Sequence, residues 1–87
     1  MSNQSCLKAI DLALDNKWDE AHKIVQELSS STAQWIHAVL HKVEGDESNS
    51  RYWYSRSGIE VYESYLDSTK ELRMIKNQIS ELSTLPK

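Results

Sequence analysis

Three histidines and one glutamate are the residues of this chain whose types and spacing could support chemistry: His22, His37, His41 and Glu44. His37 and His41 are four residues apart and therefore share a helix face, which Glu44 continues one turn later. A third imidazole from a neighbouring helix would complete a set that can hold a transition metal such as zinc. The same groups could instead form a proton-transfer pair.

These residues also have a purely structural explanation. Histidines at the boundary of a core are commonly hydrogen-bonded packing residues, and Tyr54 or Glu44 could supply the partner. The sequence contains neither a cysteine pair nor an HExxH motif, which would make a zinc site specific. We therefore expect packing histidines, with no catalytic residue, metal or other cofactor. A site for zinc or another transition metal, or a small-ligand enzyme built on it, is the alternative.

The aromatic triplet Tyr52, Trp53 and Tyr54 is the second candidate. Three consecutive residues on a helix spread over roughly 200°, so at most two of them share a face. We expect the triplet mainly to fill the core and to contact the last helix. The alternative is a surface that binds a partner, whose contacts would be Trp53, Trp35 and Arg56.

Length and composition limit both the fold and the partners. The 87 residues allow one domain with a modest core, and two glycines with one proline favour helices joined by short connections. A net charge of −3 argues against non-specific nucleic-acid binding, which depends on Lys and Arg. The longest apolar run is far shorter than the roughly 20 residues that span a bilayer. Cys6 is alone, which excludes an internal disulfide and indicates a buried thiol in a cytoplasmic protein.

Apolar periodicity predicts two helical hairpins and a C-terminal helix. The hairpins cover residues 5–28 and 31–58, and the last helix covers residues 67–83. Asn16 and Gly45 tolerate the left-handed conformation, so they are expected to form the turns. We expect Asn16 to cap the second helix as well, Asp46 to cap the fourth helix and Gly58 to end it.

Two capping boxes predict where the third and the last helix begin. Ser31 is followed three residues later by Gln34, and Ser68 by Glu71. Residues 59–66 combine an alternating pattern with one helical turn, so their conformation stays open.

The last helix carries one apolar row, which consists of Leu72, Ile75, Ile79 and Leu82, and Pro86 should end it. The row spans barely two heptads, so we expect it to cover the open end of the hairpin stack. A homodimer formed through this helix is the alternative.

A shift of 29 residues places the first hairpin on the second. Small residues then meet small ones and bulky residues meet bulky ones, as in Leu7 on Ile36, Ala9 on Ala38, Ile10 on Val39, Leu14 on Val43, Ala21 on Ser50 and Val25 on Tyr54. Such a period predicts stacked hairpins that bury matching apolar rows against each other.

Residues 38–57 resemble the later part of a tetratricopeptide repeat. The shared pattern is a small residue, a Gly-Asp turn, a small residue, an aromatic and a small residue, at Ala38, Gly45-Asp46, Ser50, Tyr54 and Ser57. The period of 29 is shorter than the 34 residues usual in that family, and Leu28 stands where a small residue is expected. The resemblance implies stacked helical hairpins.

A longer string is similar to short bacterial proteins that have no defined activity. It comprises Trp18-Asp19, Ala21-His22, Val25-Gln26, Trp35-Ile36-His37-Ala38, Leu40-His41, Glu44-Gly45-Asp46, and Asn49 through Tyr52-Trp53-Tyr54 to Arg56 and Gly58. This similarity implies membership of that family and carries no activity with it.

The sequence therefore predicts an all-α fold of two stacked antiparallel hairpins and a C-terminal amphipathic capping helix. Repeat stacks expose long ordered surfaces, so we expect a small non-enzymatic module that binds a peptide or protein. The metal-binding or small-ligand enzyme that uses the His/Glu residues between the second and third helices is the alternative. Nucleic acid and membrane are not expected as partners.

Overall fold

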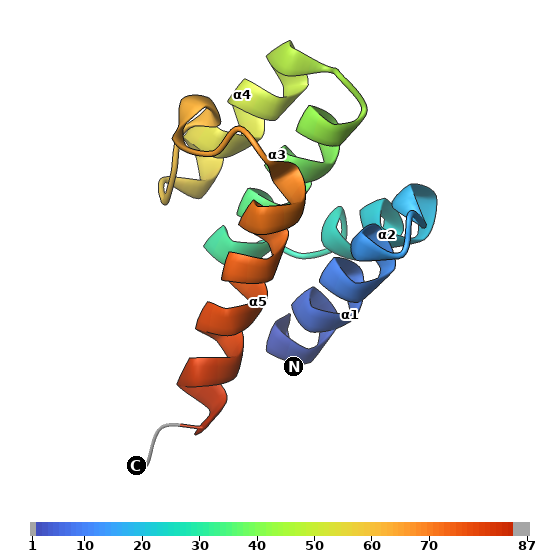
Figure 1. Cartoon of the computed structure of the whole chain (residues 1–87), viewed down its shortest axis with the longest axis vertical. Coiled ribbons are helices and arrows are strands. Elements are labelled where there is room, and N and C mark those ends of the chain that lie inside the picture. Colours follow the sequence, from blue (N-terminus) through green and yellow to red (C-terminus); the bar gives the residue numbers. More distant parts are fainter. Residues whose placement is uncertain (1, 85–87) are drawn as a thin grey trace.

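The protein is all-α, as predicted. The computed structural model describes residues 2–84, and side chains within residues 3–80. The elements are α1 (Ser2–Leu14), α2 (Trp18–Val25), α3 (Ser31–Val43), α4 (Glu47–Ser57), the 3₁₀ turn η1 (Tyr62–Ser64) and α5 (Ser68–Thr84), shown in Figure 1. The described part of the chain contains no strand, and none of its helices has the length and apolar character needed to cross a membrane.

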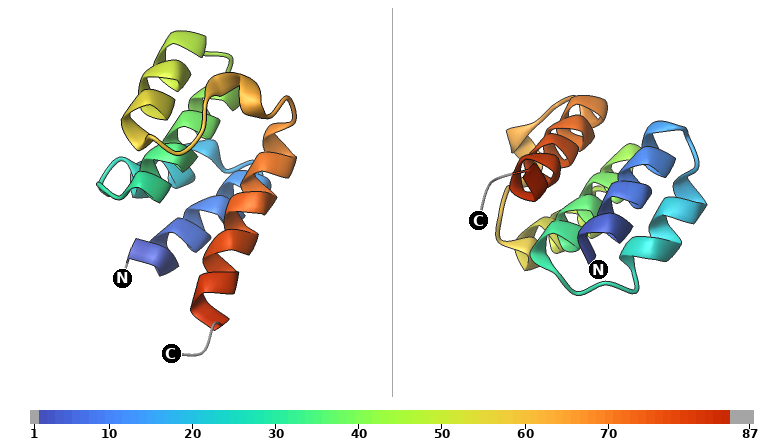
Figure 2. Two further views of the ribbon diagram at one scale, coloured as in Figure 1. Left: turned by 90° about the vertical axis from the view of Figure 1, so that its left-hand side faces the viewer. Right: turned by 90° about the horizontal axis from the view of Figure 1, so that it is seen from below.

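The helices form two hairpins that stack, with a fifth helix laid against both. α1 pairs with α2 and α3 pairs with α4, while α3 also packs on α1 and α2. α5 packs on α1 and α3, which means that it contacts one helix from each hairpin (Figure 2). α5 therefore covers a side of the stack and holds the two hairpins together.

One core runs through all five helices. It includes Ile10 of α1, Val25 of α2, Ile36 and Val39 of α3, Tyr54 of α4 and Ile75 of α5. Cys6 is fully buried in the same core, and burial raises the pKa of its thiol. Val43, which the 29-residue shift matches to Leu14 as part of the apolar rows, is instead 54% exposed.

The predicted turn residues adopt left-handed backbone conformations, and Asn16 (φ 62°), Gly45 (φ 84°) and Gly58 (φ 68°) each follow the end of a helix. Asp46 caps α4, because its carboxylate accepts a hydrogen bond at 3.3 Å from a first-turn N–H. The prediction that Asn16 also caps α2 is wrong: Lys17 takes that position, and no side chain bonds the helix start.

Both predicted capping boxes are wrong, because in each case the residue before the predicted serine caps the helix. Ser30, not Ser31, caps α3, and its hydroxyl accepts a hydrogen bond at 3.1 Å from the N–H three residues on. Asp67, not Ser68, caps α5, with its carboxylate accepting from two successive N–H groups at 2.9 and 3.2 Å. Ser30 is the residue with extended backbone, as an N-cap requires.

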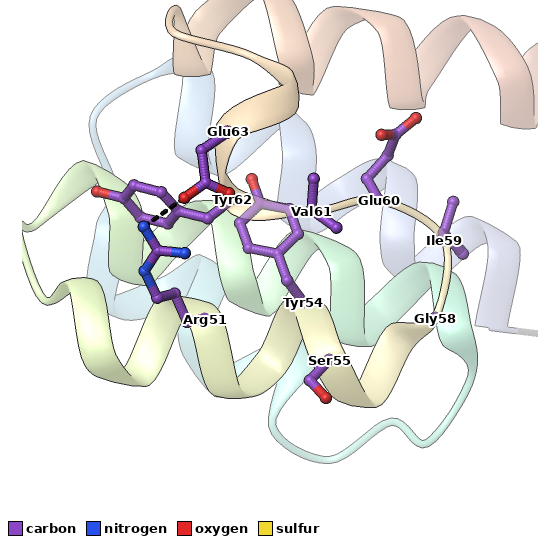
Figure 3. Close-up of a pocket in the computed structure, with 9 residues that line it drawn as sticks. All are labelled: Arg51, Tyr54, Ser55, Gly58, Ile59, Glu60, Val61, Tyr62 and Glu63. Atoms are coloured by element: carbon purple, nitrogen blue, oxygen red, sulfur yellow. Dashed lines mark ion pairs between the residues drawn. The ribbon is translucent and has the colours of Figure 1, made fainter.

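The segment after α4 turns back along that helix. Residues 59–66, whose conformation the sequence left open, form an irregular loop that contains the 3₁₀ turn η1. A pocket of about 500 Å³ lies between α4 and residues 58–63 (Figure 3). Arg51, on its α4 wall, pairs with Glu47 at 2.7 Å and with Glu63, so the charge of this arginine is already balanced.

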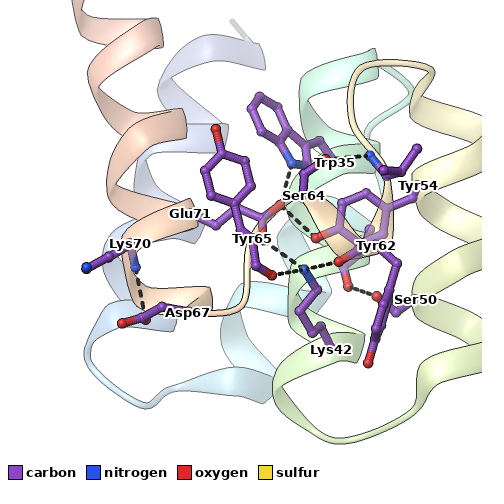
Figure 4. Close-up of polar contacts among 12 residues, drawn as sticks. Trp35, Lys42, Ser50, Tyr54, Tyr62, Ser64, Tyr65, Asp67, Lys70 and Glu71 are labelled. Atoms are coloured by element: carbon purple, nitrogen blue, oxygen red, sulfur yellow. Dashed lines mark hydrogen bonds and ion pairs between the residues drawn. The ribbon is translucent and has the colours of Figure 1, made fainter.

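Glu71 is the buried polar anchor of α5 (Figure 4). It is 0% exposed, and its Oε2 accepts hydrogen bonds from Trp35 Nε1 at 2.8 Å and from the Tyr54 hydroxyl at 2.6 Å. Lys42 Nζ lies 3.1 Å from the other oxygen. Burial and the adjacent carboxylate raise the pKa of Tyr54 above its ordinary value. A buried carboxylate is tolerated only with such partners, so this network fixes α5 on α3 and α4.

The apolar row of α5 faces the stack. Leu72, Ile75 and Ile79 are all buried, while the side chain of Leu82, together with Pro86, lies outside the described residues. The described part of this row is therefore covered within the chain and is not available as a dimer seam.

Candidate functional site

Three imidazoles meet between α2 and α3, and we call them the histidine cluster: His22, His37 and His41. One ring nitrogen from each lies within 4.8 Å of the other two. His22 and His37 share a hydrogen bond between their Nε2 atoms at 3.0 Å, and the rings of His37 and His41 stack with centroids 4.9 Å apart. The residues that the sequence placed in one hypothetical cleft are therefore together in space.

Helix geometry explains this convergence. His37 and His41 lie one turn apart on α3, and His22 approaches them from α2, which packs against α3. Trp18 fastens the start of α2 to α3, because its Nε1 donates a 2.6 Å hydrogen bond to the carbonyl of Leu40. The third imidazole is thus fixed by contacts between the two hairpins.

Glu44 binds the cluster from the end of α3, where it forms the helix C-cap. Its Oε2 lies 2.7 Å from His41 Nδ1. An ionised carboxylate can only accept, so Nδ1 donates to it, and a neutral His41 ring in this arrangement has its lone pair on Nε2. Glu44 therefore orients His41 as a carboxylate does behind a metal-ligating histidine.

Two tryptophan rings stack on the cluster. Trp18 lies on His22 with centroids 4.7 Å apart and planes 9° apart, and Trp53 lies on His37 at 4.0 Å and 13°. The sequence analysis missed Trp18 as a site residue, although its position four residues before His22 was a usable signal. Both indoles limit the rotation of the imidazole that they cover.

The electrostatic environment keeps two of the imidazoles neutral. Burial, together with the neighbouring His22 and His41, lowers the pKa of His37 to about 4. Burial also lowers the pKa of His22, with His41 acting in the same direction and with Glu44 and Asp19 opposing. A neutral imidazole is the form that binds a metal. The hydrogen bond between the two Nε2 atoms requires a proton on one of them, so a metal that binds both Nε2 atoms must displace that proton.

The dimensions of the cluster suit a small transition-metal ion. Zinc–nitrogen bonds of about 2.0–2.1 Å in a tetrahedron place ligand nitrogens roughly 3.4 Å apart. The 3.0 Å separation between His22 and His37 is close to this value, and the 4.8 Å limit for the set requires only small ring movements. No buried side-chain nitrogen or oxygen lacks a partner in the described region, so hydrogen bonding also satisfies the cluster.

Asp46 also lies near His41 and Glu44, with ligand atoms within 4.8 Å of one another. Its two oxygens accept hydrogen bonds from the backbone N–H and the side-chain amide of Asn49 at 3.3 and 2.7 Å. Asp46 is therefore committed to capping α4.

The three expected partner contacts have different surroundings. Trp35 is 2% exposed and donates to Glu71, so it cannot touch a partner and this prediction is wrong. Trp53 is half-buried against His37, and Arg56 is exposed. Tyr52 is the outward residue of the aromatic triplet (52% exposed), whereas Tyr54 is buried and bonds to α5.

Comparison with known proteins gives no match: no protein-family model, curated protein or solved structure is significantly similar to this chain. The likeness to tetratricopeptide repeats is therefore a resemblance in sequence pattern, and function must be argued from the site itself.

Proposed function

We propose that the protein binds a transition-metal ion such as zinc through His22, His37 and His41, with Glu44 orienting the third ligand. The observation that carries this proposal is the convergence of three imidazole nitrogens within 4.8 Å, one of them on a ring held by a carboxylate. A set made only of imidazoles suits zinc, copper, nickel and iron better than magnesium or calcium.

A purely structural cluster explains the contacts as two separate pairs, a hydrogen bond between His22 and His37 and a pair between His41 and Glu44 three residues on. Metal binding uses all four groups. It also links α2 to α3, and therefore the first hairpin to the second.

Metal titration tests the proposal directly. Metal-free protein titrated with zinc should bind one equivalent, and zinc at a hundredfold excess over its dissociation constant should stabilise the fold by about 2.7 kcal/mol. His22→Ala and His41→Ala should each lose this stabilisation, while Lys23→Ala, an exposed change on α2, should keep it. A wild-type protein that takes up no zinc, and whose melting temperature a chelator does not change, would contradict the proposal.

A peptide- or protein-binding module is the second candidate function. The exposed ring of Tyr52 favours it, because the Arg56 guanidinium lies 5.8 Å from the centre of that ring and holds it at the surface. Tyr52→Ala and Arg56→Ala should keep the fold and abolish the capture of a partner by immobilised protein. Equal capture by both variants and the wild type would remove this surface from consideration.

A further inference from the structure

Arg56 carries a charge that the described part of the protein does not balance. It is exposed, and it donates a long hydrogen bond of 3.4 Å to the Tyr52 hydroxyl. No carboxylate pairs with it among the described residues, whereas Arg51 on the same helix pairs with two. Most of the guanidinium donors of Arg56 are therefore free to bind an anion.

Trp53 connects this arginine to the histidine cluster. The Arg56 guanidinium carbon lies 5.6 Å from the centre of the indole ring, and the same ring stacks on His37 at 4.0 Å. A cation–π contact of this kind limits where the guanidinium can move. The free cation and a proposed metal ligand are therefore neighbours of one indole.

The site offers a metal three ligands from the chain. Glu44 is bonded to His41, and Asp46 is bonded to Asn49. A zinc ion with three protein ligands keeps a fourth position for water or an external ligand, which is the arrangement of catalytic rather than structural zinc sites.

We propose that the external ligand of this site is an oxyanion, a carboxylate or phosphate group, which binds the metal with one oxygen and receives hydrogen bonds from Arg56. This inference rests on the proposed metal site. The planar guanidinium fork suits both kinds of anion. Trp53 limits the position of the arginine through the cation–π contact.

The carboxylates around the histidine cluster should oppose the binding of an anion when no metal is bound. Glu44 and Asp19 act electrostatically on His22, and His41 acts on Asp46. These negative charges attract a metal ion and repel an anion. The oxyanion should therefore bind only after the metal has reversed the local charge.

Cobalt provides the test, because its visible spectrum reports its ligands. Protein loaded with Co²⁺ is titrated with phosphate and, separately, with acetate. Wild-type protein should show a saturable spectral change with at least one of them: phosphate alone assigns a phosphoryl ligand and acetate alone a carboxylate. Arg56→Gln should bind cobalt normally and raise the dissociation constant of that anion about tenfold.

Arg73→Gln, at an exposed arginine of α5, is the matched control and should leave both affinities unchanged. A normal cobalt spectrum that neither anion alters, or equal anion affinity in wild type and Arg56→Gln, would overturn this inference and leave the metal site standing. Equal anion binding by metal-free protein would also overturn it. A protein that binds no cobalt would overturn both proposals.

Discussion

His41 Nδ1 lies 2.7 Å from Glu44 Oε2, so the last turn of α3 carries both an imidazole and the carboxylate that sets its tautomer. The two residues lie three positions apart at the C-terminal end of one helix, so the pair needs no other element to form. His22, by contrast, comes from the other hairpin. The histidine cluster therefore combines a local arrangement, which the sequence encodes directly, with a contact that exists only after the hairpins have packed.

Replacing Glu44 by Gln should weaken zinc binding by about tenfold or more, because the carboxylate that orients His41 and increases its basicity is lost. Zinc titration of the metal-free protein measures the effect. Glu47→Gln, at an exposed carboxylate of α4, is the control and should bind zinc normally. Identical affinities for the Glu44 variant and the wild type would show that this carboxylate does not support a ligand.

The stability of the metal-free protein should depend on pH through His37. Its pKa is near 4 in the folded protein and near 6.5 in the unfolded chain. Between pH 4 and 6.5 the unfolded state therefore binds a proton that the folded state does not. The contribution of His37 to the free energy of unfolding should be complete above pH 6.5 and should decrease as the pH falls to 4. The loss should be on the order of 3 kcal/mol, with the lowered pKa of His22 acting in the same direction.

Urea unfolding at pH 7 and at pH 4.5 measures this loss, and His37→Gln is the informative variant. It should be less stable than the wild type at pH 7 and lose less stability on acidification. A wild-type stability that does not change between these pH values would contradict the buried, neutral state of this imidazole.

Glu71→Ala should destabilise the protein by about 3–5 kcal/mol, because it leaves the buried ammonium of Lys42 without its carboxylate partner. Glu71→Gln should cost less, since its amide oxygen can still accept from Trp35 or Tyr54. Chemical denaturation of the two variants gives both values. Two equal and small losses would mean that α5 is held by its apolar row alone.

Val39→Ala should reduce the free energy of unfolding by about 2–3 kcal/mol, because Val39 is fully buried in the core. Val43→Ala provides the same chemical change at an exposed position of the same helix, and it should stay within about 0.5 kcal/mol of the wild type. Chemical denaturation of both variants measures the two losses. A larger loss of unfolding free energy for Val43→Ala than for Val39→Ala would contradict the burial of Val39.

The helices and turns could be predicted from the sequence, because interactions between residues close together in the chain determine them. Apolar periodicity identified the buried rows, and the left-handed residues Asn16, Gly45 and Gly58 all adopt the conformation expected of them. The helical spacing of His37 and His41 also predicted that these two imidazoles share one face of a helix.

What the sequence could not supply depends on contacts between distant residues. Glu71 fits the pattern of a capping box, yet Asp67 caps α5 and Glu71 enters the core. Its donors Trp35 and Tyr54 lie 36 and 17 residues away along the chain. The same hydrogen bonds hold Trp35 in the core, although the sequence analysis considered it as a partner contact. No local sequence pattern predicts these hydrogen bonds.

The buried position of Glu71 also constrains the order of assembly during synthesis. Its donors come from α3 and α4, which leave the ribosome first and must wait for α5 before Lys42 is neutralised. The two hairpins are therefore not a free-standing array to which units can be added or removed. A chain that stops before residue 67 should lack the carboxylate that pairs with Lys42 and leave open the faces of α1 and α3 that α5 covers.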